Sequence, residues 1–428
     1  MGNSLTQLSL VVGPVPVVVY ALAGLTLVVL VAVPKRHRAL FLVASGIAGA
    51  SVGLLLGWLV SDVWDSFEVA LSVPTRLWLA AAVAAVGVAV ASFRGVRTWR
   101  KVLAGCAIPL FVLAGGIGIN SDVGEFPRVG DLIGHTTVRA LVLPAPSTSS
   151  PSSSVAKWVP PVDLPLKGRV GFVSIPAVTS HFAARKAIVY LPPAALVPNA
   201  PALPVLEMMS GQPGEPLNLV TSGNFPEILD SFALAHRGLA PIVVIPDQLG
   251  APQNNPMCVD SPLGNSASYL TVDVPAWVRD HLRVLPGRSD WAIGGFSQGG
   301  TCAIQLGAKY PALFGNIFDI AGQVAPHHGS IASTIRDAFG GSPARYQAAT
   351  PLALLRAGAP YPDTFAVFVS GQDDARFGPG ARVVATAAAA AGITVRSVVS
   401  PGTAHDWRTV RYALNAGIPL LMNQWGLK

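Results

Sequence analysis

Four long runs without a charged side chain lie in the first 120 residues, and they constrain the fold more than any other feature of the sequence. The runs cover residues 16–33, 39–60, 77–93 and 102–119. A helix rises ~1.5 Å per residue, so runs of this length match the ~30 Å hydrocarbon core of a membrane. We therefore expect residues 1–120 to form a region of four transmembrane helices.

The first run has an alternative interpretation as a cleaved signal peptide. Such a peptide needs a positively charged segment before its apolar core. No charged residue precedes Lys35, and three further runs follow, which favours a retained helix. No run of similar length and apolar density recurs after Ile119, so we expect a soluble domain beyond it.

The distribution of basic residues predicts the orientation of these helices. Seven of the eight Lys and Arg residues in this region lie in the loops after the first and third runs: Lys35, Arg36, Arg38, Arg94, Arg97, Arg100 and Lys101. The loop after the second run instead carries Asp62, Asp65 and Glu68, with Arg76 as its basic residue. Cytoplasmic loops are enriched in Lys and Arg. We therefore expect an integral plasma membrane protein with its N-terminus and all residues after Ile119 on the extracytoplasmic side.

The formal net charge of +7 owes much to these loops. No patch of interleaved basic and aromatic residues accompanies it, so we expect no nucleic-acid partner. We also expect no cofactor and no metal ion.

The exported part divides into a connector and a larger domain. Residues 121–157 form the connector, which contains the Ser/Pro-rich segment PAPSTSSPSSS (144–154), and residues 158–428 form the domain. A segment so rich in Ser and Pro cannot bury a core and is typical of a flexible linker.

In the larger domain, short β-branched runs alternate with helical segments. The predicted strands are 168–176, 186–192, 203–209, 240–246, 291–296, 316–322, 364–371 and 394–400, and the predicted helices are 226–236, 272–282, 298–309, 379–391 and 406–416. This alternation predicts an α/β fold with a mostly parallel sheet. No helix separates the first two strands, so we expect them to form an antiparallel hairpin at the sheet edge.

The sequence GGFSQGG (294–300) lies between a predicted buried strand and a predicted helix. In that context G-x-S-x-G forms a sharp turn that exposes the serine hydroxyl, and its glycines let the strand and helix approach closely. We therefore predict that Ser297 is a catalytic nucleophile. An ordinary tight turn is the alternative.

A serine nucleophile needs a base, and in this architecture an acidic residue and then a histidine follow it in the chain. His405 is the histidine that follows a strand and an acidic pair, so we predict that it is the base. His327 and His328 are expected in a surface loop or along a substrate cleft. The acid is Asp374, as the spacing G-x-x-D favours, or Asp373.

The oxyanion of the reaction needs two backbone N–H donors. The N–H of Gln298, which follows the nucleophile, is the first candidate. The second is the N–H of Gln212, in the loop SGQPGE after the strand at 203–209, although a simple turn would also explain that loop.

The exported part also contains two cysteines, Cys258 and Cys302. Disulfides persist outside the cytoplasm. Cys302 lies five residues after Ser297, and Cys258 lies in a loop near the end of the preceding strand, so we predict a disulfide between them. Two separately buried thiols are the alternative, and Cys106 belongs to the fourth apolar run.

With these residues identified, the larger domain resembles the esterase D family of α/β-hydrolases. The matching segments are MMSGQPG, YLTVDVPAWVRDHL, GGFSQGG, VFVSGQDD and PGTAHDW. That family includes secreted mycolyltransferases and enterochelin-type esterases, and the four-helix region looks like an accessory part of some actinobacterial relatives. Mycolyltransferases usually carry a glutamate acid, whereas no glutamate follows Ser297 here, and no segment matches their trehalose site. The acyl acceptor therefore stays open between water, a sugar and another envelope hydroxyl.

These features predict a membrane-tethered serine esterase or acyltransferase that acts on acyl esters, such as glycolipids of the cell envelope. A mycolyltransferase serving trehalose or other acceptors is the alternative within this class. A non-catalytic envelope scaffold with a hydrolase fold is a further alternative, although a scaffold would not need the full order of Ser, Asp and His. A transporter or receptor would need charged groups within its helices, and the four runs contain none.

Overall fold

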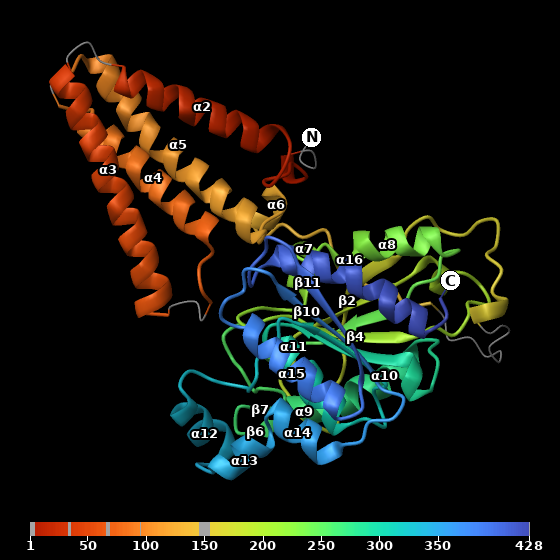
Figure 1. The fold of residues 1–428 in the computed structure, drawn as a ribbon. Coiled ribbons are helices and arrows are strands. Elements are labelled where there is room, and N and C mark those ends of the chain that lie inside the picture. Colours follow the sequence, from red (N-terminus) through yellow and green to blue (C-terminus); the bar gives the residue numbers. More distant parts are fainter. Residues whose placement is uncertain (1–4, 33–35, 66–68, 95, 145–154, 428) are drawn as a thin grey trace. The chain divides into compact units, whose positions relative to one another are not determined.

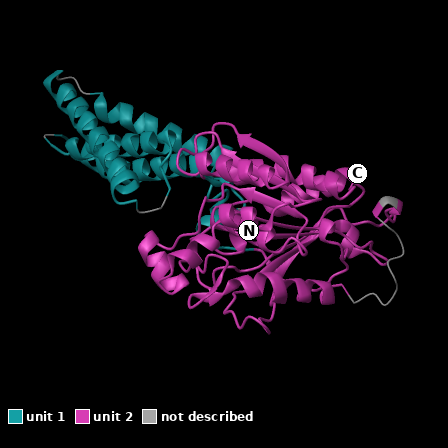
Figure 2. Ribbon diagram, turned by 60° about the horizontal axis from the view of Figure 1, so that its bottom comes forward, with its two compact units in different colours: residues 1–136, 406–408 teal, residues 137–405, 409–428 magenta. Residues whose placement is uncertain are grey.

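The computed structural model describes residues 5–32, 36–65, 69–94, 96–144 and 155–427. The chain forms two compact units, one of residues 1–136 and 406–408 and the other of residues 137–405 and 409–428 (Figure 2). We call them unit 1 and unit 2. Apart from Pro144, the predicted Ser/Pro-rich linker lies outside the described residues. The domain boundaries at residues 120 and 157 stay a prediction.

Unit 1 contains four long helices, which correspond to the four uncharged runs. They are α2 (Pro14–Val31), α3 (Arg36–Trp58), which continues as a short π-helix (Leu59–Val63), α4 (Val73–Ala91) and α5 (Thr98–Val123). All four are long and apolar enough to cross a membrane. Their outward side chains are also apolar: Val17, Leu25 and Ile47 are each more than 60% exposed. Helices that are hydrophobic all round suit an apolar surrounding rather than water.

Helices α3 and α4 approach each other closely through small residues. A Cβ on Gly53 of α3 would lie 2.7 Å from the Cα of Ala80 in α4. Small residues at such contacts allow backbones to pack closely, which is a common way to hold apolar helices together in a membrane.

Unit 2 is built on one sheet, to which nine described strands contribute. Their order is β1-β2-β3-β5-β4-β8-β9-β10-β11. The bounds are β1 Arg139–Ala140, β2 Arg169–Val173, β3 Ala187–Leu191, β4 Val205–Met209, β5 Ile242–Ile245, β8 Trp291–Phe296, β9 Asn316–Ile320, β10 Phe365–Gly371 and β11 Thr394–Ser400. Strand β3 runs antiparallel to both of its neighbours, and the other pairs are parallel. The predicted mostly parallel sheet is thus confirmed.

The prediction that the first two strands form the sheet edge was wrong. Strands β2 and β3 do pair antiparallel, but β1 pairs in parallel with β2 on its outer side. Only two residues of β1 join the ladder, and both are exposed. So short a segment has no hydrophobic pattern by which the sequence could reveal it.

Helices cover both faces of the sheet (Figure 1). One face carries α8 (Phe225–Ala235) and α16 (Trp407–Gln424), and the other carries α10 (Val274–His281), α11 (Gln298–Lys309), α14 (Pro351–Gly358) and α15 (Gly378–Ala390). This two-sided cover buries every residue of the inner strands β3, β4, β5, β8, β9 and β10. Strands buried on both faces appear as continuous apolar runs. The parallel strands end together, and the loops at this end build the candidate site.

Two carboxyl groups are exceptions within this apolar sheet. Glu207 on β4 and Asp319 on β9 are fully or almost fully buried. Asp319 accepts a hydrogen bond of 2.7 Å from the Gly322 N–H, whereas neither carboxyl oxygen of Glu207 has a partner among the described residues. Burial raises the pKa of Asp319 to about 7 and that of Glu207 well above its usual value.

The stability of unit 2 is expected to fall as the pH rises from about 4 to about 7. In this range the unfolded chain ionises Asp319, with its ordinary pKa of about 3.9, while the folded chain keeps it protonated. The contribution of Asp319 is on the order of 4 kcal/mol across the range, and it is constant above pH ~7. Asp374 has a lowered pKa, so its contribution is lost only as the pH falls below about 4.

The measurement compares the thermal midpoints of the parent chain and Asp319→Asn at a series of pH values. Asparagine keeps the acceptor for Gly322 but does not ionise, so its midpoint should decline less over this range. Parallel curves for the two proteins would contradict the assignment.

Candidate active site

The serine of the G-x-S-x-G motif lies on the sharp turn that joins β8 to α11. Ser297 has φ 57° and ψ −114°, a conformation that residues other than glycine rarely adopt. Two neighbouring hydrogen bonds hold it there: its N–H donates to the Ile320 carbonyl of β9 (2.8 Å), and its carbonyl accepts from the Thr301 N–H (3.0 Å). Strained backbone held in this way is common at functional sites.

The glycine two positions after the serine is required by close packing. A Cβ on Gly299 would lie 2.6 Å from the carbonyl oxygen of Met209, at the end of β4. Any larger residue would push the first turn of α11 away from the sheet. This contact is the physical reason for the glycine that makes the motif recognisable.

The structure brings three predicted residues into one hydrogen-bonded series. The Oγ of Ser297 lies 2.8 Å from Nε2 of His405, and Nδ1 of His405 lies 3.0 Å from Oδ2 of Asp374. Asp374 lies in the turn after β10, and His405 lies in the loop after β11. Three loops at the same end of the sheet therefore supply the series.

The structure distinguishes between the two neighbouring aspartates. Asp374 is buried, and its Oδ1 accepts a hydrogen bond of 2.9 Å from the Phe377 N–H. Burial opposes its ionisation, but hydrogen bonds from His405 and from backbone N–H groups outweigh that effect and hold its pKa below the usual value. Asp373 is exposed, and its own N–H donates to the carbonyl of Thr403.

Two phenylalanine rings pack against the imidazole of His405. Their centroids lie 4.9 Å (Phe296) and 4.5 Å (Phe377) from that of the histidine ring. They leave 6% of the His405 side chain exposed. Phe296 lies within the G-x-S-x-G motif, but nothing in the sequence indicated that it would contact the histidine, and Phe377 was not predicted at all.

The two expected oxyanion donors lie on backbone segments beside the serine. Gln298 begins α11, where N–H groups have no intrahelical acceptor. Gln212 follows Gly211, and a Cβ on that glycine would lie 3.5 Å from the Cβ of Ser297. Among the described residues, no acceptor is found for either N–H. Their role in holding an oxyanion stays a prediction.

The other predicted groups take no part in the series. His327 and His328 are half-buried in the loop between β9 and α12 (Ile331–Phe339). In the described part of the chain, no group of three His, Cys, Asp or Glu residues could hold a metal ion.

A cavity of about 630 Å³ lies at the opposite end of the sheet, between residues 195–202 and 279–284, and so is remote from Ser297.

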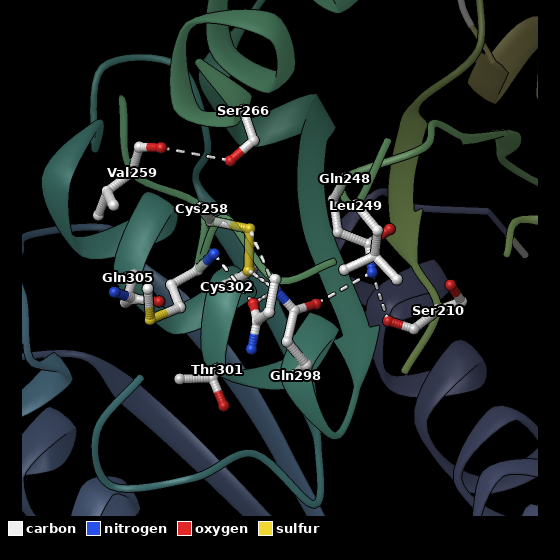
Figure 3. Close-up of a disulfide and its surroundings, with 12 residues drawn as sticks. Ser210, Gln248, Leu249, Cys258, Val259, Ser266, Gln298, Thr301, Cys302 and Gln305 are labelled. Atoms are coloured by element: carbon white, nitrogen blue, oxygen red, sulfur yellow. Dashed lines mark hydrogen bonds between the residues drawn. A yellow bond between two sulfur atoms is a disulfide. The ribbon is translucent and has the colours of Figure 1, made fainter. Parts of the chain in front are cut away.

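The structure joins Cys258 and Cys302 in a disulfide, with Cα atoms 5.5 Å apart (Figure 3). The bond links the loop after β5 to helix α11, while Cys106 is free and exposed. Both bonded cysteines are at most 2% exposed.

Replacing both bonded cysteines by alanine is expected to lower the free energy of unfolding of unit 2 by roughly 2–4 kcal/mol, because the unfolded chain loses a cross-link over a long loop. Denaturant titration measures this difference. Alkylation of the unreduced parent should modify Cys106 alone; modification of all three thiols would contradict the bond.

Comparison with known proteins gives a consistent family assignment. The family described as "Putative esterase" matches residues 183–417. An uncharacterized protein of Corynebacterium glutamicum is 40% identical over 177 residues, which are 41% of this chain and 42% of that protein. The match thus spans less than half the length of that relative.

Solved structures share the fold of unit 2. An S-formylglutathione hydrolase from Agrobacterium tumefaciens superposes with a TM-score of 0.52 at 21% identity, covering 61% of this chain and 97% of that one. A ferulic acid esterase superposes with a TM-score of 0.51 at 17% identity, covering 60% and 98%. At these identities the likeness concerns the α/β-hydrolase fold alone.

Proposed function

Because this chain belongs to the putative esterase family, we propose that it is a carboxylic ester hydrolase and that Ser297, His405 and Asp374 are its catalytic triad. The observation that carries the proposal is the series of distances from the serine hydroxyl through the imidazole to the buried carboxylate, 2.8 Å and 3.0 Å. A nucleophile, a base and a group that orients the base, all within hydrogen-bond reach, are what acyl transfer requires.

In the first half of the reaction, Ser297 Oγ attacks the ester carbonyl carbon while its proton moves to His405 Nε2. Asp374 accepts a hydrogen bond from Nδ1–H, which selects the tautomer with a free Nε2 and stabilises the imidazolium. The N–H groups of Gln298 and Gln212 stabilise the oxyanion, each by roughly 3–4 kcal/mol. The C–O bond to the alcohol then breaks, and the imidazolium gives its proton to the departing oxygen.

In the second half, an acceptor hydroxyl attacks the acyl-serine. His405 takes the proton of the acceptor, and the bond between Ser297 Oγ and the acyl carbon breaks as the imidazolium gives that proton to Oγ. Water as acceptor gives a carboxylic acid, and an alcohol gives a new ester. The resemblance to mycolyltransferases supports trehalose or another envelope hydroxyl as the alternative acceptor.

We place the four apolar helices in the plasma membrane and the catalytic domain, residues 158–428, on its extracytoplasmic side. The supporting observations are the length and composition of the helices, the basic residues of their predicted inner loops, and a disulfide in unit 2. Disulfides persist in oxidising compartments. Acyl esters of the cell envelope are therefore the proposed substrates.

The proposed activity is tested by incubating the detergent-solubilised full chain with p-nitrophenyl esters of graded acyl length, with and without trehalose. Turnover of at least one ester supports the proposed esterase activity, and the preferred acyl length indicates the size of the acyl-binding pocket. Acyl-trehalose as the main product would identify a transferase. Lack of turnover at every length would favour the non-catalytic scaffold.

The orientation is tested with reporter fusions in membranes. Alkaline phosphatase, which is active only outside the cytoplasm, should be active when fused after residue 154 and inactive when fused after His37. The reason is the seven basic residues confined to the two predicted inner loops. The reverse pattern would overturn the orientation.

A further inference from the structure

Three buried amide side chains join the loops around Ser297 in one directional series. The amide nitrogen of Gln248 donates to the Ser210 carbonyl (2.7 Å) and to Oε1 of Gln298 (3.0 Å) (Figure 3). The amide nitrogen of Gln298 donates in turn to Oδ1 of Asn255 (3.0 Å), whose own nitrogen donates to the His327 carbonyl (2.8 Å). We call Gln248, Gln298 and Asn255 the amide chain.

Both ends of the amide chain lie on backbone carbonyls, which accept and cannot donate. The direction of every hydrogen bond between them is therefore fixed. The three side chains are at most 5% exposed. Hydrogen bonds within such a dry network are strong and hold the joined segments in one arrangement.

The disulfide supports the same network. The amide nitrogen of Gln298 lies 3.2 Å from Sγ of Cys302, which is bonded to Cys258. Asn255 is three residues from Cys258, so the cross-link restrains the loop that carries this member of the amide chain. Both polar atoms of the Gln298 side chain, Oε1 and Nε2, therefore have partners.

Stability alone gives no good reason for a glutamine at position 248. Its Oε1 is buried and has no partner among the described residues. An unsatisfied buried acceptor costs about 1–3 kcal/mol. Gln305 has a similar unpaired oxygen, so what distinguishes Gln248 is the pair of segments that its two donated hydrogen bonds connect.

Those segments are the two that carry the expected oxyanion donors. Ser210 begins the segment Ser210–Gly211–Gln212 after β4, and Gln298 follows the nucleophile. We propose that Gln248 is a positioning residue that sets the distance between the two halves of the oxyanion hole. This inference rests on the proposed esterase function. A hole that is too wide weakens hydrogen bonds to the transition state while leaving substrate binding nearly intact.

The test is Gln248→Met in the full chain, with the best p-nitrophenyl ester as substrate. Methionine keeps the length of the side chain and removes both donated hydrogen bonds. We expect kcat to fall 10- to 100-fold and KM to stay within threefold. A boronic acid, which forms a tetrahedral adduct with the serine, should bind 10- to 100-fold more weakly, and the product carboxylate should bind unchanged.

Gln305→Met is the matched control. Gln305 is also buried, lies on α11, donates to a backbone carbonyl (Ala349, 2.8 Å), and has an unpaired Oε1. Its hydrogen bond goes to Ala349 and to neither oxyanion segment, so kcat should not change. Equal kcat values for Gln248→Met and Gln305→Met would overturn the inference.

Gln298→Met provides a second variant, because it breaks the same connection and keeps the backbone N–H. It also removes the hydrogen bond to Asn255, so its kcat should fall at least as far. The double variant Gln248→Met/Gln298→Met should be little slower than Gln298→Met, because both variants break the connection between the two side chains. If Gln248→Met does not fold, an unchanged kcat in Gln298→Met overturns the inference. An inactive parent chain would instead refute the proposed function.

Discussion

Replacing Ser297 by alanine is expected to lower kcat for ester hydrolysis by roughly 10⁶-fold, and His405→Ala should cost nearly the same. Without the hydroxyl no acyl-enzyme can form. Without the imidazole, which lies 2.8 Å from that hydroxyl, the serine keeps its proton and is a weak nucleophile. Steady-state kinetics of purified full-length variants measure both losses.

The two residues act as a unit, so the double variant should be only slightly slower than either single one. His281→Ala serves as the control, because His281 lies at the end of α10 beside the remote cavity. Its kcat should match that of the parent. Losses that multiply in the double variant would contradict a shared role.

Asp374→Asn is expected to lower kcat by roughly 10⁴-fold, whereas Asp373→Asn should stay within about threefold of the parent. An asparagine at 374 can donate to Nδ1 and so favours the tautomer in which Nε2 carries the proton. The base is then blocked although the geometry is retained. Asp373 is exposed, and its backbone N–H makes the hydrogen bond to Thr403 that asparagine would keep.

The pH dependence of kcat/KM should differ between these two aspartate variants as well. Asp373→Asn should keep the pH profile of the parent, because it leaves the imidazole and its partner untouched. If Asp373→Asn were instead the slower enzyme, Asp373 would be the acid, and the roles of serine and histidine would stand.

The sequence predicted the inner strands well because they are buried on both faces. Segments such as WAIGGF (291–296) and TFAVFVSG (364–371) are therefore mostly apolar, so they are conspicuous in the chain. The turn at Ser297 was also predictable, since the close approach of α11 to β4 admits only glycine at position 299. Both features can be recognised from short stretches of consecutive residues.

Features that depend on tertiary contacts were not predictable. The short edge strand β1 has no pattern of its own, and its presence corrects the predicted edge hairpin. The rings of Phe296 and Phe377 meet His405 only after three loops converge. The amide chain is of the same kind, because an isolated glutamine such as Gln248 carries no motif.

The sequence alone could not decide whether Asp373 or Asp374 is the acid of the proposed triad. Spacing after Gly371 favoured Asp374, but both residues stand in one turn. The turn after β10 buries one side chain against the imidazole and exposes the other, and that difference arises from the tertiary structure.

The most direct test of the proposed triad is labelling with a fluorophosphonate, which phosphonylates an activated serine. The full chain is treated in detergent, digested and mapped by mass spectrometry. We expect one adduct, on Ser297, in the parent and no adduct in Ser297→Ala or His405→Ala. An unlabelled parent, or a Ser297→Ala variant labelled as strongly as the parent, would contradict the account.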